Sequence, residues 1–260
     1  MKSFAFALTL GAVSAIHVYE LEYMNYLAQF GKTMNDIDEF NTRLEYFKQT
    51  DLEIKEINER QSNHRAAHNQ FSDWSHEEYK SILGLKPFEA ANDKEIPTVT
   101  FDESANAETV NWVSAGAVTP VKDQGACGSC WSFSSTGAME GAHFVRTGSL
   151  LSFSEQQLVD CATSGNMGCN GGNPIYSYYY YERNGAILES SYPYTSSRGD
   201  DSTDCYSYAD TGVYVTNFAQ VSSNNSSQMK AALNQQPLAV LVEADQSSFQ
   251  TYSSGVLMSS

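Results

Sequence analysis

Positive charge is scarce in this chain. It holds 15 Lys and Arg residues against 31 Asp and Glu residues, so its formal net charge is −16 over 260 residues. So little positive charge argues against binding to the phosphate backbone of nucleic acids, and we expect no nucleic-acid partner. The hydrophobic share of 41% excludes a mostly disordered or collagen-like chain.

A long hydrophobic run is also missing. No stretch reaches the roughly 18 apolar residues of a membrane span, so we expect no span. A shorter apolar run, from Phe4 to Ala15, follows Lys2 and ends in the small residues Val13-Ser14-Ala15. This order is typical of a secretory signal peptide, with a buried N-terminal helix as the alternative. We therefore predict a signal peptide over residues 1–15 and a lysosomal, vacuolar or extracellular destination.

Cysteine is absent from the first 126 residues of the chain. The odd number of later cysteines predicts two disulfides and one free thiol in a secreted protein. Cys127 and Cys130 form a C-x-x-C pair, which keeps a zinc or redox site open as an alternative. Because no second pair of cysteines or histidines with ligand spacing follows, we expect no metal and no other cofactor. The five cysteines are Cys127, Cys130, Cys161, Cys169 and Cys205.

The amino-acid composition changes along the chain. Residues 16 to about 86 contain neither cysteine nor proline, and their pattern is helical. The clearest helix runs from Glu39 to Asn58, with an apolar stripe of Leu44, Phe47, Ile54 and Ile57. Residues 87–106 resemble a linker, and from about Glu108 onward Gly, Ser, Tyr and Cys become frequent.

The later part predicts helices first and strands afterwards. One helix is expected from Cys130 to Arg146, closed by Gly148. Ser154 and Gln157 have the spacing of a capping box at the start of another helix. This order of elements indicates an α+β fold with a helical half and a β half. The remaining predicted elements are the end of the second helix at Cys161, a helix over 174–183, and strands over 213–218 and 238–242.

One segment of the second part carries chemistry. Cys130 stands at the start of a predicted helix, where the helix dipole and unpaired N–H groups favour the nucleophilic thiolate. Gln124, six residues earlier, offers an amide donor. Together with the Cys130 N–H, that donor is suited to stabilising the oxyanion formed when a thiolate attacks a carbonyl. Gly125 and Gly128 allow a second chain to approach the backbone closely.

These residues resemble the active-site region of the papain family of cysteine proteases. Cys127-Gly128-Ser129-Cys130-Trp131 matches that family's local signature at every position. The resemblance implies a papain-like two-domain fold, in which a helical domain faces a β-barrel-like domain that is incomplete in this chain. Other matches follow in family order: Asn111-Trp112, Gly116 to Val121, Gln124-Gly125, Ser154 to Gln156, Asp160-Cys161, Gly168 to Gly172, Tyr192 to Tyr194 and Gln236-Pro237.

The first part resembles the inhibitory propeptide of cathepsin L-like members of this family. Thr50 replaces one asparagine of the family's helix motif, and Ala67 replaces the glycine of its second motif. The resemblance divides the chain into a signal peptide (1–15), a mainly helical propeptide (16–104) and a peptidase domain (105–260). The matching motif residues are Glu39, Arg43, Phe47, Ile54, Asn58, Asn69, Phe71 and Asp73.

The resemblance also implies roles for single residues. Cys130 is similar to the nucleophile that forms a thioester with the substrate, and Gln124 to the oxyanion-hole donor. The family's pairing implies the disulfides Cys127–Cys169 and Cys161–Cys205, which leave Cys130 free. The implied substrate-binding residues are Gly171 and Gly172, for the peptide backbone, and Asn173, Pro174 and Leu241, for the side chain two residues before the scissile bond.

The sequence departs from the family at the catalytic base. The family places its histidine about 130–150 residues after the cysteine, and Ser260 lies 130 residues after Cys130. The last histidine, His143, is thirteen residues beyond Cys130 on the same predicted helix, about 20 Å away. We therefore assign neither a base nor its orienting asparagine, and we expect this chain, an incomplete version of a protease zymogen, to be inactive.

Two functions remain open from the sequence. The first is a monomeric cysteine endopeptidase zymogen that hydrolyses proteins and peptides and is inhibited by its own propeptide. The alternative is a non-catalytic relative whose propeptide inhibits related proteases. The sequence also leaves open whether either of two overlapping glycosylation sequons, in Asn224-Asn225-Ser226-Ser227, is used.

Overall fold

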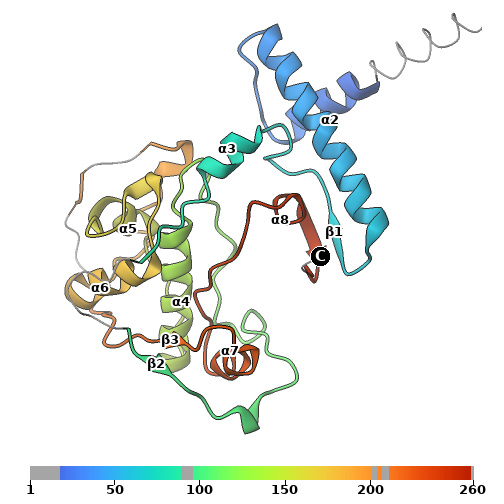
Figure 1. Ribbon diagram of the computed structural model, residues 1–260. Coiled ribbons are helices and arrows are strands. Elements are labelled where there is room, and N and C mark those ends of the chain that lie inside the picture. The colour runs from blue at the N-terminus through green and yellow to red at the C-terminus, as the bar shows by residue number, and fades with distance from the viewer. Residues whose placement is uncertain (1–17, 89–95, 201–203, 207–210, 259–260) are drawn as a thin grey trace, which may run out of the picture. The chain divides into compact units, whose positions relative to one another are not determined.

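A computed structural model of the chain describes residues 18–88, 96–200, 204–206 and 211–258 (Figure 1). The chain forms two compact units. The first extends to Lys80 and also includes the stretch from Glu243 onward, and the second runs from Ser81 to Val242. The predicted signal peptide lies outside the described residues. The units divide the chain differently from the predicted processing boundary at residues 104 and 105, which stays a prediction.

The first unit contains the long helix α2 (Ile37–Arg60). Asp36 caps it by accepting a hydrogen bond from the Glu39 N–H at 2.8 Å, and the Glu39 carboxylate accepts from the Asn35 N–H at 2.8 Å. The apolar stripe predicted from the sequence is buried at Leu44, Phe47 and Ile54. The predicted helix is therefore confirmed, with two more residues at each end.

Aromatic side chains form the core between α2 and a helical stretch over residues 18–29. Tyr23 and Tyr26 lie in this core, and both hydroxyls donate to the Asp73 carboxylate at 3.1 Å. Lys32 forms an ion pair with the same carboxylate, which is 1% exposed. Burial and the neighbouring Asp73 charge raise the pKa of both tyrosines. The buried charge is thus satisfied by one cation and two hydroxyl donors.

Several residues of the predicted propeptide motifs form hydrogen bonds between neighbouring elements of the first unit. Arg43 forms two hydrogen bonds with Glu78 at 2.5 and 2.6 Å, which tie α2 to the start of α3 (His76–Ser81). The Asn58 amide pairs with both backbone groups of Ala66, at 2.9 and 3.0 Å. This amide holds the strand β1 (His64–Ala66) against α2. The motif residues therefore act as links between neighbouring elements of the unit.

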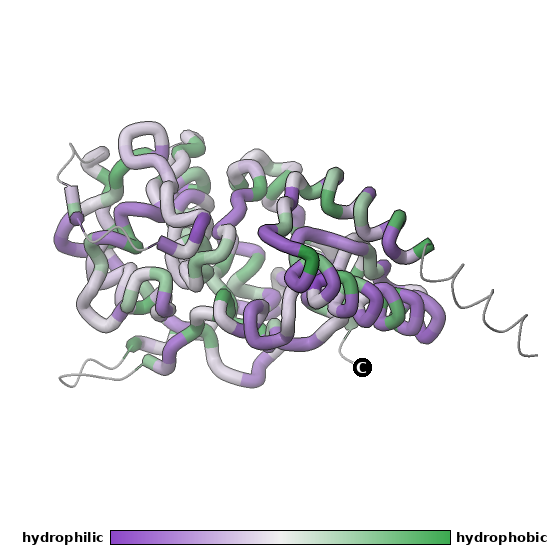
Figure 2. Tube along the Cα trace, turned by 90° about the horizontal axis from the view of Figure 1, so that it is seen from above, coloured by the Kyte–Doolittle hydropathy of each residue, from purple (hydrophilic) through white to green (hydrophobic). Residues whose placement is uncertain are grey.

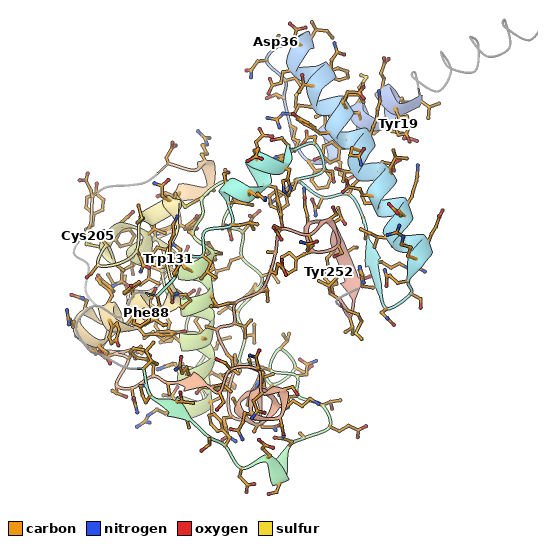
Figure 3. All side chains as sticks on the ribbon, in the orientation of Figure 1. Tyr19, Asp36, Phe88, Trp131, Cys205 and Tyr252 are labelled. Carbon is orange, nitrogen blue, oxygen red and sulfur yellow. A yellow bond between two sulfur atoms is a disulfide. The ribbon has the colours of Figure 1, made fainter. Side chains whose placement is uncertain are left out.

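A late segment of the chain completes the first unit. The strand β4 (Tyr252–Gly255) pairs antiparallel with β1, and the register shifts between Arg65 and Ala66. The short helix α8 (Ser247–Gln250) precedes β4, and the Asn69 amide donates to the Gln250 carbonyl. Figure 1 shows β1 and β4 side by side, and Figure 3 labels Tyr252 on β4.

Three helices form the core of the second unit, and all three were predicted. They are α4 (Cys130–Thr147), α5 (Glu155–Cys161) and α6 (Pro174–Asn184). Gly148 ends α4 in the left-handed conformation, with φ at 76°. Ser154 caps α5 by accepting from the Gln157 N–H at 2.9 Å. The buried core consists of Trp131, Met139, Phe153, Leu158, Val159, Ala162, Tyr181 and Ala186.

Only half of the predicted capping box forms at α5. The Gln157 side chain does not reach back to Ser154 but donates to the Gly185 carbonyl at 3.0 Å and accepts from the Ile187 N–H at 2.9 Å. The helix is thereby connected to the loop after α6. The sequence spacing of a capping box was correct for the cap and wrong for the partner of the glutamine.

The two predicted strands over 213–218 and 238–242 are wrong in this structure, because neither segment is a strand there. In the first segment, Val213 and Val215 instead pack as partly buried residues against the helical core. In the second, Leu241 and Val242 are exposed. Alternating apolar residues form a strand only beside a hydrogen-bonded neighbour. In the described part of this unit, Val213 accepts one backbone hydrogen bond from the Ala186 N–H at 2.9 Å, but neither segment forms a ladder with a neighbouring strand.

The second unit also contains a two-stranded parallel sheet, in which β2 (Thr98–Val99) pairs with β3 (Gln220–Val221). The helix α7 (Ser226–Leu233) follows β3. The side-chain amide of Gln228 on α7 accepts a hydrogen bond from the Phe101 N–H at 2.7 Å and donates one to the Phe101 carbonyl at 2.9 Å. The short 3-10 turn of residues 103–105 continues from there. Residues 97–106 are therefore anchored along β3 and α7.

Hydrophobic residues are distributed in short stretches along the helices. Figure 2 shows hydrophilic and hydrophobic residues mixed along the helical tubes. None of the described helices is both long enough and apolar enough to cross a membrane.

Candidate active site

Cys130 lies at the first position of α4, as predicted, and it is the free cysteine. The disulfides Cys127–Cys169 and Cys161–Cys205 are both present. The first of them joins the loop before α4 to the 3-10 turn at Gly168–Asn170. Because this disulfide uses Cys127, the zinc or redox alternative loses one of its two cysteines. The described residues also contain no group of three or more side chains suited to holding a metal.

The loop before Cys130 is held from two sides. The Tyr194 hydroxyl donates to the Gln124 carbonyl at 2.9 Å and lies 2.8 Å from the Ser129 hydroxyl. On the other side, the Ala126 N–H donates to the Ser197 carbonyl at 2.8 Å. These contacts fix both ends of the segment that positions the nucleophile. Sequence reasoning placed Tyr194 in a matching motif but gave it no role, because its contact with residue 124 spans seventy positions.

A buried glutamine on α5 supports the same loop. The Gln156 carbonyl oxygen accepts from the N–H groups of Thr195 and Ser196, at 2.8 and 3.1 Å. Its amide nitrogen donates to Asp160 at 2.8 Å. The Gln156 side chain is 1% exposed, so each of these hydrogen bonds is costly to lose. Gln156 therefore fixes the start of the 3-10 turn Ser196–Arg198, whose Ser197 carbonyl contacts Ala126.

The Gln124 amide points at a carbonyl from the first part of the chain. Its Nε2 donates to the Ile82 carbonyl at 3.1 Å and to the Cys127 carbonyl at 2.8 Å. A carbonyl oxygen on this donor stands where the oxyanion of an attacked substrate is expected. The predicted role of Gln124 thus fits its geometry, and residue 82 occupies the donor in this state.

The segment Ile82–Lys86 lies against the candidate substrate-binding residues. The Gly172 N–H donates to the Gly84 carbonyl at 2.8 Å, and the Lys86 N–H donates to the Gly172 carbonyl at 2.9 Å. Together they make a parallel bridge between Leu85 and Gly172. The Asn173 amide adds a hydrogen bond to the Lys86 carbonyl at 2.9 Å. An extended peptide therefore occupies this strip already.

Space at this contact is tight. A Cβ atom built on Gly84 would overlap the carbonyl oxygen of Gly128 and lie 2.7 Å from its carbonyl carbon. The Gly128 N–H is in turn hydrogen-bonded to the Cys169 carbonyl at 2.9 Å. Gly84 is needed because its backbone passes close to that of Gly128, and Gly128 is needed because a Cβ there would overlap the Cys169 carbonyl oxygen.

The Cys130 thiol is not activated in this state. Burial raises the pKa of Cys130, and the backbone N–H groups of Gly84, Trp131 and Cys130 offset that effect only in part. The position of Cys130 at a helix start predicts the thiolate form instead. Burial of the thiol outweighs this local effect in the folded chain.

The other implied site residues differ in burial. Asn173 caps α6 by accepting from the Ile175 N–H at 3.1 Å, and Pro174 follows as the first helical residue. Both are buried beside Gly172. Leu241 is 61% exposed on an extended segment, so its assignment to the same pocket stays a prediction.

No described histidine of the second unit lies beside Cys130. His143 is the histidine of that unit, and its ring packs edge-on against Phe153, thirteen residues along α4 from the thiol. The histidines His64, His68 and His76 belong to the first unit. Among the described residues, the free thiol of Cys130 and the Gln124 amide therefore have no histidine of the second unit beside them.

A cluster of charged residues beneath the site was missed by sequence reasoning. Lys122 contacts Glu155 at 2.6 Å and Glu140 at 3.1 Å, and both carboxylates are nearly inaccessible to solvent. Burial lowers the pKa of Lys122, but the two carboxylates outweigh it, so the pKa is raised. Glu189 also faces Glu155, and its carboxylate accepts from the Tyr194 N–H at 2.9 Å. No sequence pattern connects these four residues, which come from separate elements.

Comparison with known proteins agrees with this geometry. Residues 106–260 match the family described as "Papain family cysteine protease", and residues 23–79 match the "Cathepsin propeptide inhibitor domain (I29)". The "Cathepsin L-like peptidase" of Aedes aegypti is 38% identical, over 94% of this chain and 77% of its own length. "Cysteine proteinase 6" of Dictyostelium discoideum is 40% identical, over 84% of this chain but only 51% of its own length.

Solved precursor structures show the same fold. Digestive procathepsin L 3 from the larval midgut of Tenebrio molitor has a TM-score of 0.75 at 31% identity, over 93% of this chain and 78% of that one. The recombinant stem bromelain precursor has a TM-score of 0.76 at 30% identity, over 92% of this chain and 76% of that one. Fold and site together define a cysteine protease precursor. The chain belongs to the papain family of cysteine proteases and carries a cathepsin-type inhibitory propeptide.

Proposed function

We propose that the protein is a cysteine endopeptidase zymogen that hydrolyses protein and peptide substrates through Cys130. The observation that carries this proposal is the Ile82 carbonyl on the Gln124 amide, 3.1 Å from its nitrogen, in a segment whose Gly84 N–H is hydrogen-bonded to the free thiol. A peptide carbonyl is thus held by the donor that the reaction needs. In the active enzyme a substrate carbonyl takes that place.

The proposed chemistry follows from the residues present. The Cys130 sulfur attacks the substrate carbonyl carbon, and the carbonyl oxygen gains negative charge beside the Gln124 amide and the Cys130 N–H. Collapse of this intermediate expels the amine, which takes up a proton, and leaves a thioester on Cys130. Water then cleaves the thioester and regenerates the thiol. The proton acceptor for the attack is a histidine in this family, and none of the described histidines of the second unit is placed for it.

The covering segment explains how the zymogen is kept inactive. Gly84 and Lys86 occupy the Gly172 backbone, which a substrate needs for binding. The Gly84 N–H is also hydrogen-bonded to the Cys130 thiol, so the segment contacts the nucleophile itself. Inhibition therefore acts by occupying the place of the substrate, and removal of the segment frees that place.

Processing and destination belong to the same proposal. Residues 107–111 are exposed and lie between two anchored segments, which supports cleavage near Ala105 to Thr109. The two disulfides support a route through the secretory pathway to a lysosome, a vacuole or the cell exterior. The names of related digestive proteinases from Homarus americanus are consistent with such a route. We propose that the enzyme acts as a monomer.

The test is hydrolysis of a fluorogenic peptide by the full-length gene product after acid processing. The peptide carries an apolar residue two positions before the scissile bond. Cys130→Ala should abolish turnover because no other thiol is free. Gln124→Ala should lower kcat by about 10²- to 10³-fold, the usual effect of losing one oxyanion donor. Turnover that survives Cys130→Ala would overturn the proposal, and binding of related proteases without turnover would favour the inhibitor alternative.

A further inference from the structure

The turn between β3 and α7 carries two overlapping sequons that the proposed protease function does not use. Asn224-Asn225-Ser226 is the first sequon, and Asn225-Ser226-Ser227 is the second. The sequence alone does not distinguish them, because both satisfy the same pattern. Both asparagines are exposed in the structure, and they differ in backbone conformation and in hydrogen bonding.

Asn224 is exposed at the tip of the turn. Its φ is 55°, which makes it the non-glycine residue with positive φ within the described part of the chain. Asparagine tolerates this left-handed conformation better than most residues. The turn is therefore one that suits asparagine locally, and its exposed side chain leaves room for a large substituent.

Asn225 has a structural task instead. Its side-chain oxygen caps α7 by accepting from the Gln228 N–H at 3.0 Å. The first turn of α7 is also covered by another segment. The Ser227 hydroxyl donates to the Glu103 carboxylate at 2.6 Å, and the Asn106 amide donates to the Ser227 carbonyl at 3.3 Å. A glycan on the Asn225 amide would begin beside this contact and would crowd residues 103–106.

We propose that Asn224 is an N-glycosylation site and that Asn225 is not. The co-reactant is a polyprenyl-diphosphate-linked oligosaccharide. A bond forms between the Asn224 amide nitrogen and C1 of the first sugar, the bond between C1 and the diphosphate oxygen breaks, and the amide nitrogen loses one proton. The modification rests on the proposed secretory route but not on catalysis, so its test does not depend on activity.

The glycan at Asn224 leaves the anchoring of residues 97–106 intact. Gln228 keeps its two hydrogen bonds to Phe101, since it lies four residues beyond Asn224 and its side chain is buried. The cap on Asn225 is likewise unaffected. The modified turn therefore stays folded and gains a large hydrophilic group on an exposed surface.

Two serine substitutions separate the sequons. Ser226→Ala removes the sequon of Asn224 and leaves that of Asn225, whereas Ser227→Ala does the opposite. The chain is expressed in a eukaryotic host behind a leader known to direct secretion. The secreted protein is deglycosylated enzymatically in ¹⁸O-labelled water, and peptide mass spectrometry identifies the asparagine converted to labelled aspartate.

We expect label at position 224 in the unchanged chain and in Ser227→Ala, and its loss in Ser226→Ala. Label at position 225 in the unchanged chain would overturn the assignment. A secreted chain without label at either position would overturn it as well. Both results are independent of whether the protein hydrolyses peptides.

Discussion

Replacing Gly84 with alanine should expose the Cys130 thiol in the zymogen. The added Cβ would overlap the Gly128 carbonyl, so the segment Ile82–Lys86 has to move away from the site. Overpacking of this kind costs about 1–3 kcal/mol. We therefore expect alkylation of Cys130 by iodoacetamide at neutral pH to be about 10- to 100-fold faster than in the unchanged chain.

The readout is specific because the other four cysteines are in disulfides. Gly137→Ala on α4 is the matched control, since a Cβ there meets no atom within 4 Å. Its alkylation rate should equal that of the unchanged chain. If Gly84→Ala reacts no faster than this control, the contact between Gly84 and Gly128 does not cover the thiol.

Replacing Glu189 with glutamine should remove a pH-dependent part of the protein's stability. Burial and the nearby Glu155 carboxylate raise the pKa of Glu189 to about 7, in spite of the hydrogen bond from the Tyr194 N–H. One oxygen of Glu155 and one of Glu189 have no hydrogen-bond donor among the described residues. A proton on Glu189 supplies that donor, so the folded state favours the protonated acid.

The direction of the pH effect follows from the two pKa values. In the unfolded chain the carboxyl titrates near 4.5, and in the folded protein near 7. Between these values the unfolded chain releases the proton while the folded protein keeps it. The stabilising contribution is therefore fully present below about 4.5 and is lost as the pH rises through about 7.

The glutamine amide replaces the protonated carboxyl at every pH. After discounting for partial exposure, we expect the free energy of unfolding of Glu189→Gln at pH 8 to exceed that of the unchanged chain by about 1–2 kcal/mol. That difference corresponds to a Tm higher by about 3–6 °C, and it should vanish in mild acid. Thermal unfolding followed by circular dichroism from acid to neutral pH measures this, with exposed Glu182→Gln as the control. If Tm depended on pH in the same way for all three proteins, Glu189 would not hold a proton that it donates to Glu155.

Local patterns predicted most of the helical structure. The spacing of Leu44, Phe47 and Ile54 identified α2, and Gly148 and Ser154 marked the end of α4 and the start of α5. These signals succeeded because a helix is determined by contacts within a few residues. The disulfide pairing was implied by family resemblance, since spacing alone leaves three pairings for four cysteines.

Contacts that join distant segments were not predictable in the same way. The segments over 213–218 and 238–242 have strand-like sequences, but a strand depends on a partner that the sequence of the segment does not specify. The grouping of Lys122, Glu155 and Glu189 depends on three separate elements. The backbone hydrogen bond from Gly84 to the Cys130 thiol likewise joins positions forty-six residues apart, so no local pattern indicates it.

The central claim is that Cys130 is the nucleophile of a substrate site that residues 82–86 occupy in the zymogen. It is tested most directly by treating the full-length gene product with a peptidyl epoxide before and after acid processing. The mass of the adduct and its position are then read by mass spectrometry. We expect one adduct, on Cys130, after processing and essentially none before it. Equal labelling before and after processing, or an adduct at another residue, would contradict the account.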